Sequence, residues 1–276
     1  MIAETDEMTR ECFAGRRLYG DDFGSDAIKE WYADEENAYF TLVNSNKEAS
    51  ENEAYGYDAF NQIHAFRSLG KRRFGTCLVF GCARGLDVKP LASRVDNFIA
   101  LEPAEKWWRD EIGGTPARYV KPAINGAIPL ANGSVELAIS LGVLHHIPNV
   151  SYVVGEVARV LKPGGIFVVR EPIISMGDWR RPRKGLTIHE RGIPPKLLLA
   201  MLAMQNLRVT KASPVMIPIV SLLGRLLGIR YAYSRALLVR LDAFLSWLLW
   251  PNFRYHRVAL HHKFAPTAMF IVAVKD

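Results

Sequence analysis

An apolar strand, a glycine turn and a second strand ending in an acid constrain this fold more than any other feature of the sequence. Residues 78–80 are apolar and lead into Gly-Cys-Ala-Arg-Gly at 81–85. A second apolar segment, 97–101, ends at Glu102, which follows Gly81 by 21 residues. Such a turn lets backbone N–H groups approach a ligand closely, and the acid can bind both hydroxyls of a ribose. The pattern predicts a site for an adenosine-containing cofactor.

Apolar and amphipathic segments alternate from residue 76 onward, which is typical of an α/β fold. We expect a seven-stranded, mostly parallel sheet with helices on both faces. The expected strands lie near 77–80, 97–101, 118–121, 136–141, 166–170, 207–211 and 268–274. The expected helices lie near 87–94, 104–112, 151–161 and 194–205.

The sequence predicts that the chain divides into four parts. Residues 1–75 form an N-terminal helical layer, with helices over 26–42 and about 57–69, and 76–213 form the cofactor-binding core. Residues 214–265 are a helical elaboration, rich in basic and apolar side chains and divided near Gly228, and 266–276 are the last strand. No uncharged apolar run in the elaboration reaches the length of a membrane span.

Charge is distributed unevenly along the 276 residues. Residues 1–60 hold 5 Lys/Arg against 15 Asp/Glu, whereas 170–276 hold 17 against 5. The basic half favours an anionic partner, although a solvated basic face explains it equally well. Peripheral membrane contact through 214–250 is one such partner. Nucleic acid is not expected, because long aliphatic runs interrupt the basic residues.

The three cysteines cannot all pair, and the acidic N-terminus lacks the apolar segment of a secretory signal. These features predict reduced thiols and a cytoplasmic location, with the inner face of the membrane as the alternative.

The later motifs discriminate between cofactor families. Leu144-His145-His146-Ile147-Pro148 ends a strand, and Arg159-Val160-Leu161-Lys162-Pro163-Gly164-Gly165 ends the following helix. Together with the glycine turn they resemble class I S-adenosylmethionine (AdoMet)-dependent methyltransferases, over about residues 76–172. The resemblance implies a Rossmann-like fold. The flanks at 18–23 and 170–180 are similar to bacterial methyltransferases associated with cell-surface polysaccharide biosynthesis.

The resemblance also implies which residues bind AdoMet. Gly81, Cys82, Ala83 and Gly85 stand in the family's glycine loop, and Glu102 stands where an acid binds the ribose. Asn125 and Gly126 occupy the adenine position, and Leu141 ends the strand that faces the sulfonium. Two positions depart from the family's pattern, because Val79 replaces an acid and Ala83 a glycine.

Methyl transfer to a hydroxyl requires removal of a proton, which makes His145, His146 and Glu171 the candidate catalytic residues. All three follow strands whose carboxyl ends form the ligand-binding edge of such a sheet. Each also has a structural interpretation: one of two adjacent histidines usually turns inward, and Glu171 can pair with an arginine. No metal site is expected, because zinc-binding motifs are missing and the paired histidines lack ligand spacing.

The methyl acceptor is left open by the sequence. An O-directed reaction on a sugar or glycan intermediate, including one carried by a lipid phosphate, is the first hypothesis. A quinone- or polyketide-like small molecule is the second, and a catalytically silent module that keeps the fold is the third. A basic cluster would hold an anionic acceptor, or is simply an exposed loop; it comprises Arg180, Arg181, Arg183 and Lys184. Trp107 and Trp108 either stack on adenine or pack in the core.

Overall fold

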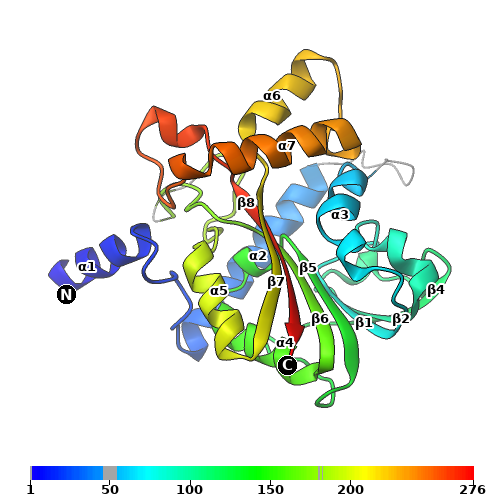
Figure 1. The fold of residues 1–276 in the computed structure, drawn as a ribbon. Coiled ribbons are helices and arrows are strands. Elements are labelled where there is room, and N and C mark those ends of the chain that lie inside the picture. Colours follow the sequence, from blue (N-terminus) through cyan, green and yellow to red (C-terminus); the bar gives the residue numbers. More distant parts are fainter. Residues whose placement is uncertain (1, 46–54, 180, 182) are drawn as a thin grey trace.

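The computed structural model describes residues 2–45, 55–179, 181 and 183–276. Figure 1 shows one twisted sheet through the centre of the molecule with helices on both faces. Its strands are β1 (Phe74–Phe80), β2 (Val95–Leu101), β3 (Glu111–Ile112), β4 (Thr115–Val120), β5 (Val135–Leu141), β6 (Leu161–Pro172), β7 (Leu207–Val215) and β8 (Ala268–Lys275). They lie in the order β3-β4-β2-β1-β5-β6-β8-β7. The predicted Rossmann-like α/β fold is confirmed, and all seven predicted strands are present.

The sheet has eight strands instead of seven, because a helix predicted over 104–112 does not form. Only a short 3-10 turn, η3 (Glu105–Trp107), occupies its first half, and β3 occupies its end. Gly113 and Gly114 have φ values of +62° and +83°, which turn β3 back into an antiparallel pair with β4. Two consecutive left-handed residues are the requirement of a tight hairpin, and this hairpin overrides the helical pattern.

The middle of the sheet is parallel and one end is antiparallel. β1 pairs in parallel with β2 and β5, and β5 pairs in parallel with β6. β8 runs antiparallel between β6 and β7. The carboxyl ends of β1, β2, β5 and β6 therefore meet at one edge, where ligands bind in open α/β sheets.

Helices cover the two faces and the ligand-binding edge. The α-helices are α1 (Ile2–Phe13), α2 (Ser25–Ser45), α3 (Asp58–His64), α4 (Val150–Val160), α5 (Pro195–Met204), α6 (Pro218–Leu226) and α7 (Ala236–Leu248). The remaining 3-10 turns are η1 (Phe66–Leu69), η2 (Lys89–Arg94), η4 (Leu144–His146), η5 (Ala232–Ser234), η6 (Trp250–Asn252) and η7 (Leu260–Lys263). The predicted helix 87–94 is thus the 3-10 turn η2, with Pro90 in its first turn.

Two apolar cores lie on opposite faces of the sheet. One joins α3, α6 and α7 to the sheet through buried residues such as Phe60, Val220 and Leu238. The other joins α4 and α5 to it through Val153 and Leu198. No helix in the described part of the chain is long and apolar enough to cross a bilayer.

The segment between β7 and β8 folds back over the carboxyl edge (Figure 1). α6 ends before Gly228, whose φ of +67° turns the chain toward α7, as the sequence predicted. The buried Asp242 of α7 accepts the N–H groups of Met216 and Ile217 at 2.9 and 2.8 Å, which ties α7 to the start of α6. α6 and the residues between it and α7 supply one wall of the candidate site.

Candidate functional site

A cavity of about 1010 Å³ lies at the carboxyl edge of the sheet. Its floor is the turn after β1, from Gly81 to Arg84, together with Leu141 at the end of β5. The segment before α3 contributes Tyr55 and Tyr57. α6 and the residues that follow it close the opposite side and include Ser221, Arg225, Arg230 and Tyr233. The fold therefore brings together the predicted glycine turn and the predicted helical elaboration.

The turn after β1 depends on left-handed backbone. Gly81, Ala83 and Gly85 have φ values of +51°, +47° and +75°. A Cβ at Gly85 would lie 2.7 Å from the Ile112 side chain, so this glycine is sterically required. Ala83 replaces the family's middle glycine and adopts the strained conformation nevertheless, at a cost of about 1–2 kcal/mol.

Glu102 holds this turn in place. Its carboxylate accepts the N–H groups of Ala83 and Ala104, each at 2.9 Å. The side chain is 2% exposed, and burial raises the pKa of its carboxyl. A carboxylate has about four acceptor positions, so two remain for ribose hydroxyls. Glu102 does not itself line the cavity in this conformation.

The predicted adenine residues lie next to α4 and do not line the cavity. Asn125 is exposed, and its side chain accepts the N–H of Ala127 at 3.0 Å. Gly126 has a φ of +81°, and a Cβ there would lie 2.6 Å from Val153 of α4. Of the eight predicted AdoMet residues, Gly81, Cys82, Ala83 and Leu141 line the cavity. Gly85, Glu102, Asn125 and Gly126 do not line it.

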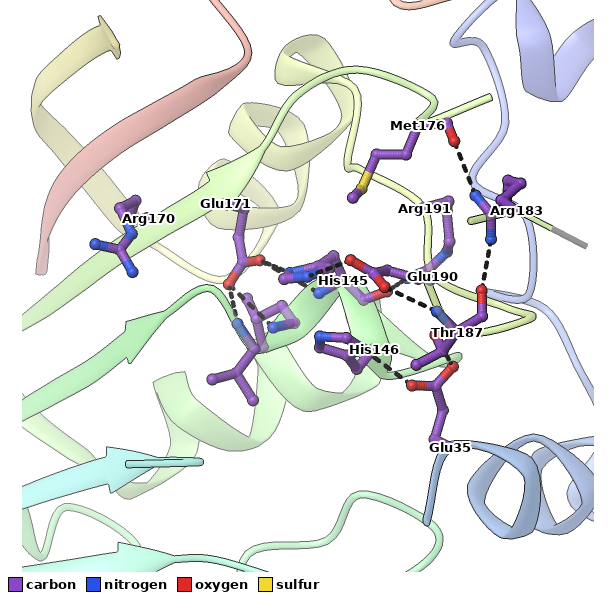
Figure 2. Close-up of polar contacts among 12 residues, drawn as sticks. Glu35, His145, His146, Arg170, Glu171, Met176, Arg183, Thr187, Glu190 and Arg191 are labelled. Atoms are coloured by element: carbon purple, nitrogen blue, oxygen red, sulfur yellow. Dashed lines mark hydrogen bonds and ion pairs between the residues drawn. The ribbon is translucent and has the colours of Figure 1, made fainter. Parts of the chain in front are cut away.

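The predicted catalytic residues form a separate cluster (Figure 2). Glu171 is fully buried and accepts the N–H groups of Val143 and Leu144 at 3.0 Å. Its other oxygen lies 2.7 Å from Nδ1 of His145. Burial opposes the charged form of His145, yet the hydrogen bond to Glu171 and the negative charges of Glu171 and Glu190 outweigh it and raise its pKa to about 9. Glu171 therefore organises the turn after β5.

His146 points away from the cavity toward helix α2. Its Nδ1 lies 2.9 Å from Glu35, and its side chain is about a third exposed. Neither histidine nor Glu171 is among the residues that line the cavity. Their role as catalytic bases stays a prediction, and this conformation places other groups nearer the cofactor loop.

Asp87 and Arg170 are cavity residues that sequence analysis missed. Asp87 has one carboxylate oxygen, Oδ1, that is inaccessible and has no hydrogen-bond partner among the described residues. Burial raises the pKa of Asp87 to about 7, although nearby Arg170 opposes this. An acid inside the apolar run Leu86–Val88 was the available signal.

Arg170 spans the cavity floor. It donates to the Leu141 carbonyl at 3.2 Å and to Asn61 Oδ1 at 3.1 Å, with its guanidinium 4.9 Å from the centre of the Tyr57 ring. It is the residue immediately before Glu171 on β6, and the two side chains emerge on opposite faces of the sheet, as consecutive strand residues must.

The basic cluster after β6 is only partly available to a ligand. Arg183 donates to the carbonyls of Met176, Thr187 and Ile188 at 2.9–3.1 Å and so closes its own loop. Arg181 and Lys184 are exposed. Arg180 lies outside the described residues.

The two tryptophans after β2 have different surroundings. Trp107 lines the cavity and lies 4.7 Å from the Arg84 guanidinium, whereas Trp108 packs against the core and donates to the Glu102 carbonyl at 3.0 Å.

Comparison with known proteins agrees with this geometry. Residues 78–169 match the family described as a methyltransferase domain. An uncharacterized methyltransferase from Mycobacterium sp. (strain JLS) is 31% identical over 123 residues, which is 43% of this chain and 44% of that protein. The chain thus matches less than half the length of this curated relative.

Solved structures extend the likeness in fold to most of the chain. An S-adenosylmethionine-dependent methyltransferase from Mesorhizobium loti covers 76% of this chain and 96% of its own, with 16% identity and a TM-score of 0.52. A protein from Listeria monocytogenes described as an S-adenosylmethionine-dependent methyltransferase covers 79% and 100%, with 14% identity and a TM-score of 0.53. At these identities the likeness shows the fold alone. The segment that matches the methyltransferase-domain family, residues 78–169, contains the glycine turn at the cavity floor and lies within the part of the chain whose fold these structures share.

Proposed function

We propose that the whole chain is an AdoMet-dependent O-methyltransferase whose acceptor is an anionic sugar or glycan intermediate. The observation that carries this proposal is that Arg225 and Arg230 line the same cavity as the glycine turn. Bound AdoMet supplies an activated methyl group on a sulfonium. The chain has to hold the acceptor beside it, take up a proton and limit access of water.

The cavity is large enough for two ligands. Pockets for a single small molecule measure about 300–1,000 Å³, and this cavity measures about 1010 Å³. Gly81 and Leu141 lie on its floor, where the cofactor loop is expected. The opposite wall, formed by α6 and the residues after it, remains for the acceptor.

Asp87 is the proposed acceptor of the proton. It lines the cavity together with Gly81, Ala83 and Arg170. The acceptor oxygen would bond to the methyl carbon as the methyl–sulfur bond of the cofactor breaks and the neutral thioether leaves, and the hydroxyl proton would pass to the Asp87 carboxylate. A group that titrates near neutral pH suits this task, and burial raises the pKa of Asp87 to about 7.

Arg225 and Arg230 are the proposed contacts for the anion. Both are exposed side chains of the insertion between β7 and β8. An arginine binds phosphate or carboxylate through paired N–H donors, and such charge-assisted bonds are the strong ones. Tyr57 and Tyr233 add aromatic surface that can pack against a sugar ring.

A lipid carrier for the acceptor would explain the outer surface of the same insertion. Leu226, Leu237 and Trp247 are 76%, 78% and 69% exposed, and Arg235 and Arg240 lie exposed among them. Exposed apolar side chains interspersed with cations fit the headgroup region of an anionic membrane. An acceptor on a lipid phosphate would then reach the cavity from the membrane side.

Methyl transfer from labelled AdoMet tests the acceptor. Glycan intermediates on a lipid phosphate, free sugar phosphates and a set of quinones are compared with wild type and with Arg225→Ala/Arg230→Ala. We expect transfer to the phosphorylated acceptors and at least a tenfold rise in KM in the double variant. Arg208→Ala, an exposed arginine on β7 outside the cavity, is the matched control.

Other outcomes identify the alternatives. Transfer to a quinone-like acceptor that ignores both arginines would replace this proposal with the small-molecule one. AdoMet binding without transfer to any acceptor would favour the silent module. For the membrane, Trp247→Ser should reduce co-sedimentation with phosphatidylglycerol vesicles, whereas Met204→Ser, which is equally exposed on α5, should not.

A further inference from the structure

The two histidines after β5 converge with a third side chain from a distant segment. His145, His146 and Glu190 each offer one ligand atom, and these atoms lie within 4.8 Å of one another. Glu190 comes from the loop between β6 and α5, and both histidines come from the 3-10 turn η4. Figure 2 shows His145 between Glu171 and Glu190, with His146 beside it. This cluster is separate from the cavity, because none of its three members lines it.

A carboxylate orients each histidine from behind. Nδ1 of His145 lies 2.7 Å from Glu171, and Nδ1 of His146 lies 2.9 Å from Glu35. Each bond occupies Nδ1, so Nε2 is the ring nitrogen left to bind another group. Metal-binding histidines are held in this way, with the distal ring N–H donated to a carboxylate. Two such pairs side by side form a prepared ligand set.

The remaining distance is too long for a direct bond. Nε2 of His145 and Oε1 of Glu190 are 3.6 Å apart, beyond the usual length of a charge-assisted hydrogen bond. An ion bound at about 2.0–2.1 Å in tetrahedral geometry holds its ligand atoms about 3.3 Å apart. The gap therefore matches two ligands of one ion better than it matches an ion pair.

We propose that His145, His146 and Glu190 bind one divalent transition-metal ion such as Zn²⁺. Imidazole and carboxylate ligands suit zinc, and three protein ligands leave one coordination position open. The sequence predicted no metal, because two adjacent histidines lack the spacing of known motifs. The two histidine rings, tilted with their centroids 4.1 Å apart, and a third ligand 44 positions further along the chain together complete a ligand set that the sequence spacing did not indicate.

The bound ion would fasten three segments that are far apart in sequence. η4 follows β5, Glu190 lies beyond β6, and Glu35 supports the site from helix α2. Thr187 strengthens the same junction, because its hydroxyl donates to Glu35 at 2.6 Å and its N–H donates to Glu190 at 3.1 Å. The ion would thus hold helix α2, through Glu35, and the loop after β6 against the turn after β5.

Metal uptake by the tag-free, chelator-treated protein tests this proposal. Zn²⁺ is titrated calorimetrically, and Co²⁺ is titrated with its visible absorption as a second readout. We expect one ion per chain and tetrahedral-type Co²⁺ bands. His146→Asn and Glu190→Gln should each weaken binding at least 100-fold, and Glu35→Ala, which removes only a support, should weaken it about 10–100-fold.

A control pair separates this site from ordinary histidine binding. His261→Asn/His262→Asn removes the other adjacent histidines, which lie in η7, and should leave the affinity unchanged. Far-UV circular dichroism and AdoMet titration show whether each variant is folded, and the partly exposed His146 makes its variant the safer one. Absence of one-to-one uptake, or equal affinity in folded His146→Asn and wild type, would overturn the proposal. The cluster would then be an imidazolium between two carboxylates.

Discussion

The Glu102 carboxylate holds the turn after β1, and we expect it also to bind the ribose of AdoMet. Stability and cofactor-binding assays on one variant distinguish these two roles. Glu102→Ala leaves the N–H groups of Ala83 and Ala104 without their acceptor, which lies at 2.9 Å from each. An unsatisfied buried donor costs about 1–3 kcal/mol. The free energy of unfolding should therefore fall by about 2–6 kcal/mol. Relief of the backbone strain at Ala83 would reduce this loss.

The same substitution should weaken cofactor binding. If the two unused acceptor positions of the carboxylate hold the ribose hydroxyls, their loss reduces affinity at least tenfold, about 1.4 kcal/mol. Calorimetric titration with AdoMet and with its demethylated product measures this, and urea denaturation of the same preparations measures stability. Glu102→Gln keeps one acceptor oxygen and should fall between wild type and Glu102→Ala in both assays.

The matched control is Glu105→Ala, three positions further on and exposed, which should change neither quantity. A folded Glu102→Ala protein that is destabilised yet binds AdoMet as tightly as wild type would refute the ribose assignment. The carboxylate would then serve only to hold the turn after β1.

Three further predictions concern buried groups. Burial raises the pKa of Asp87 from 3.8 to about 7, so the folded state holds this proton more tightly than the unfolded state, and stability falls as pH rises from 3.8 to about 7, where the loss becomes complete. Asp87→Asn should therefore raise the free energy of unfolding by up to about 4 kcal/mol at pH 8 and by little at pH 3.5. The rate of methyl transfer in this variant should no longer increase as pH rises through 7. Equal stability gains at both pH values would contradict this. Arg191 is fully buried and donates to the carbonyls of Tyr19, His145, Ile147 and Pro148 at 2.8–3.1 Å, so Arg191→Met should lower the free energy of unfolding by at least about 3 kcal/mol in urea titration. A Cβ at Gly192 would lie 2.1 Å from the Ile174 carbonyl oxygen, so Gly192→Ala should lower the melting temperature well below that of Gly24→Ala, a site with nothing within 4 Å.

The strands could be predicted because each is a run of apolar residues buried in the middle of the sheet. β5, for example, is Val-Glu-Leu-Ala-Ile-Ser-Leu, of which only Glu136 is incompletely buried. The short strand β3, which lies where a helix over 104–112 was predicted, could not be predicted in the same way. There the local pattern competes with the hairpin that Gly113 and Gly114 impose, and tertiary pairing with β4 decides the outcome.

The residues that cluster from distant positions were beyond sequence reasoning. The Glu35–His146 contact joins residues 111 positions apart, and Arg225 reaches the cavity from an insertion that follows β7. Pairings of this kind depend on how helices cross the sheet, which no local pattern encodes. Gly81 and Glu102, by contrast, could be placed because both stand directly at strand ends.

One part of the site was nevertheless predictable from strand geometry. Successive side chains in a strand alternate between the two faces of the sheet. On β6, Val168 belongs to the core beneath α3, α6 and α7, and Val169 belongs to the core beneath α4 and α5. Continuing the alternation sends Arg170 toward the cavity and Glu171 toward His145, as their contacts confirm.

The same alternation places Leu141 of β5 with Arg170 and Ser140 with Glu171, 3.3 Å away. Position at the carboxyl edge therefore does not suffice to make a residue catalytic, because that edge has two sides. The cofactor loop and Asp87 share one side with Arg170. The histidines share the other with Glu171, which is why they are better suited to organise the turn after β5, and to bind an ion there, than to deprotonate an acceptor.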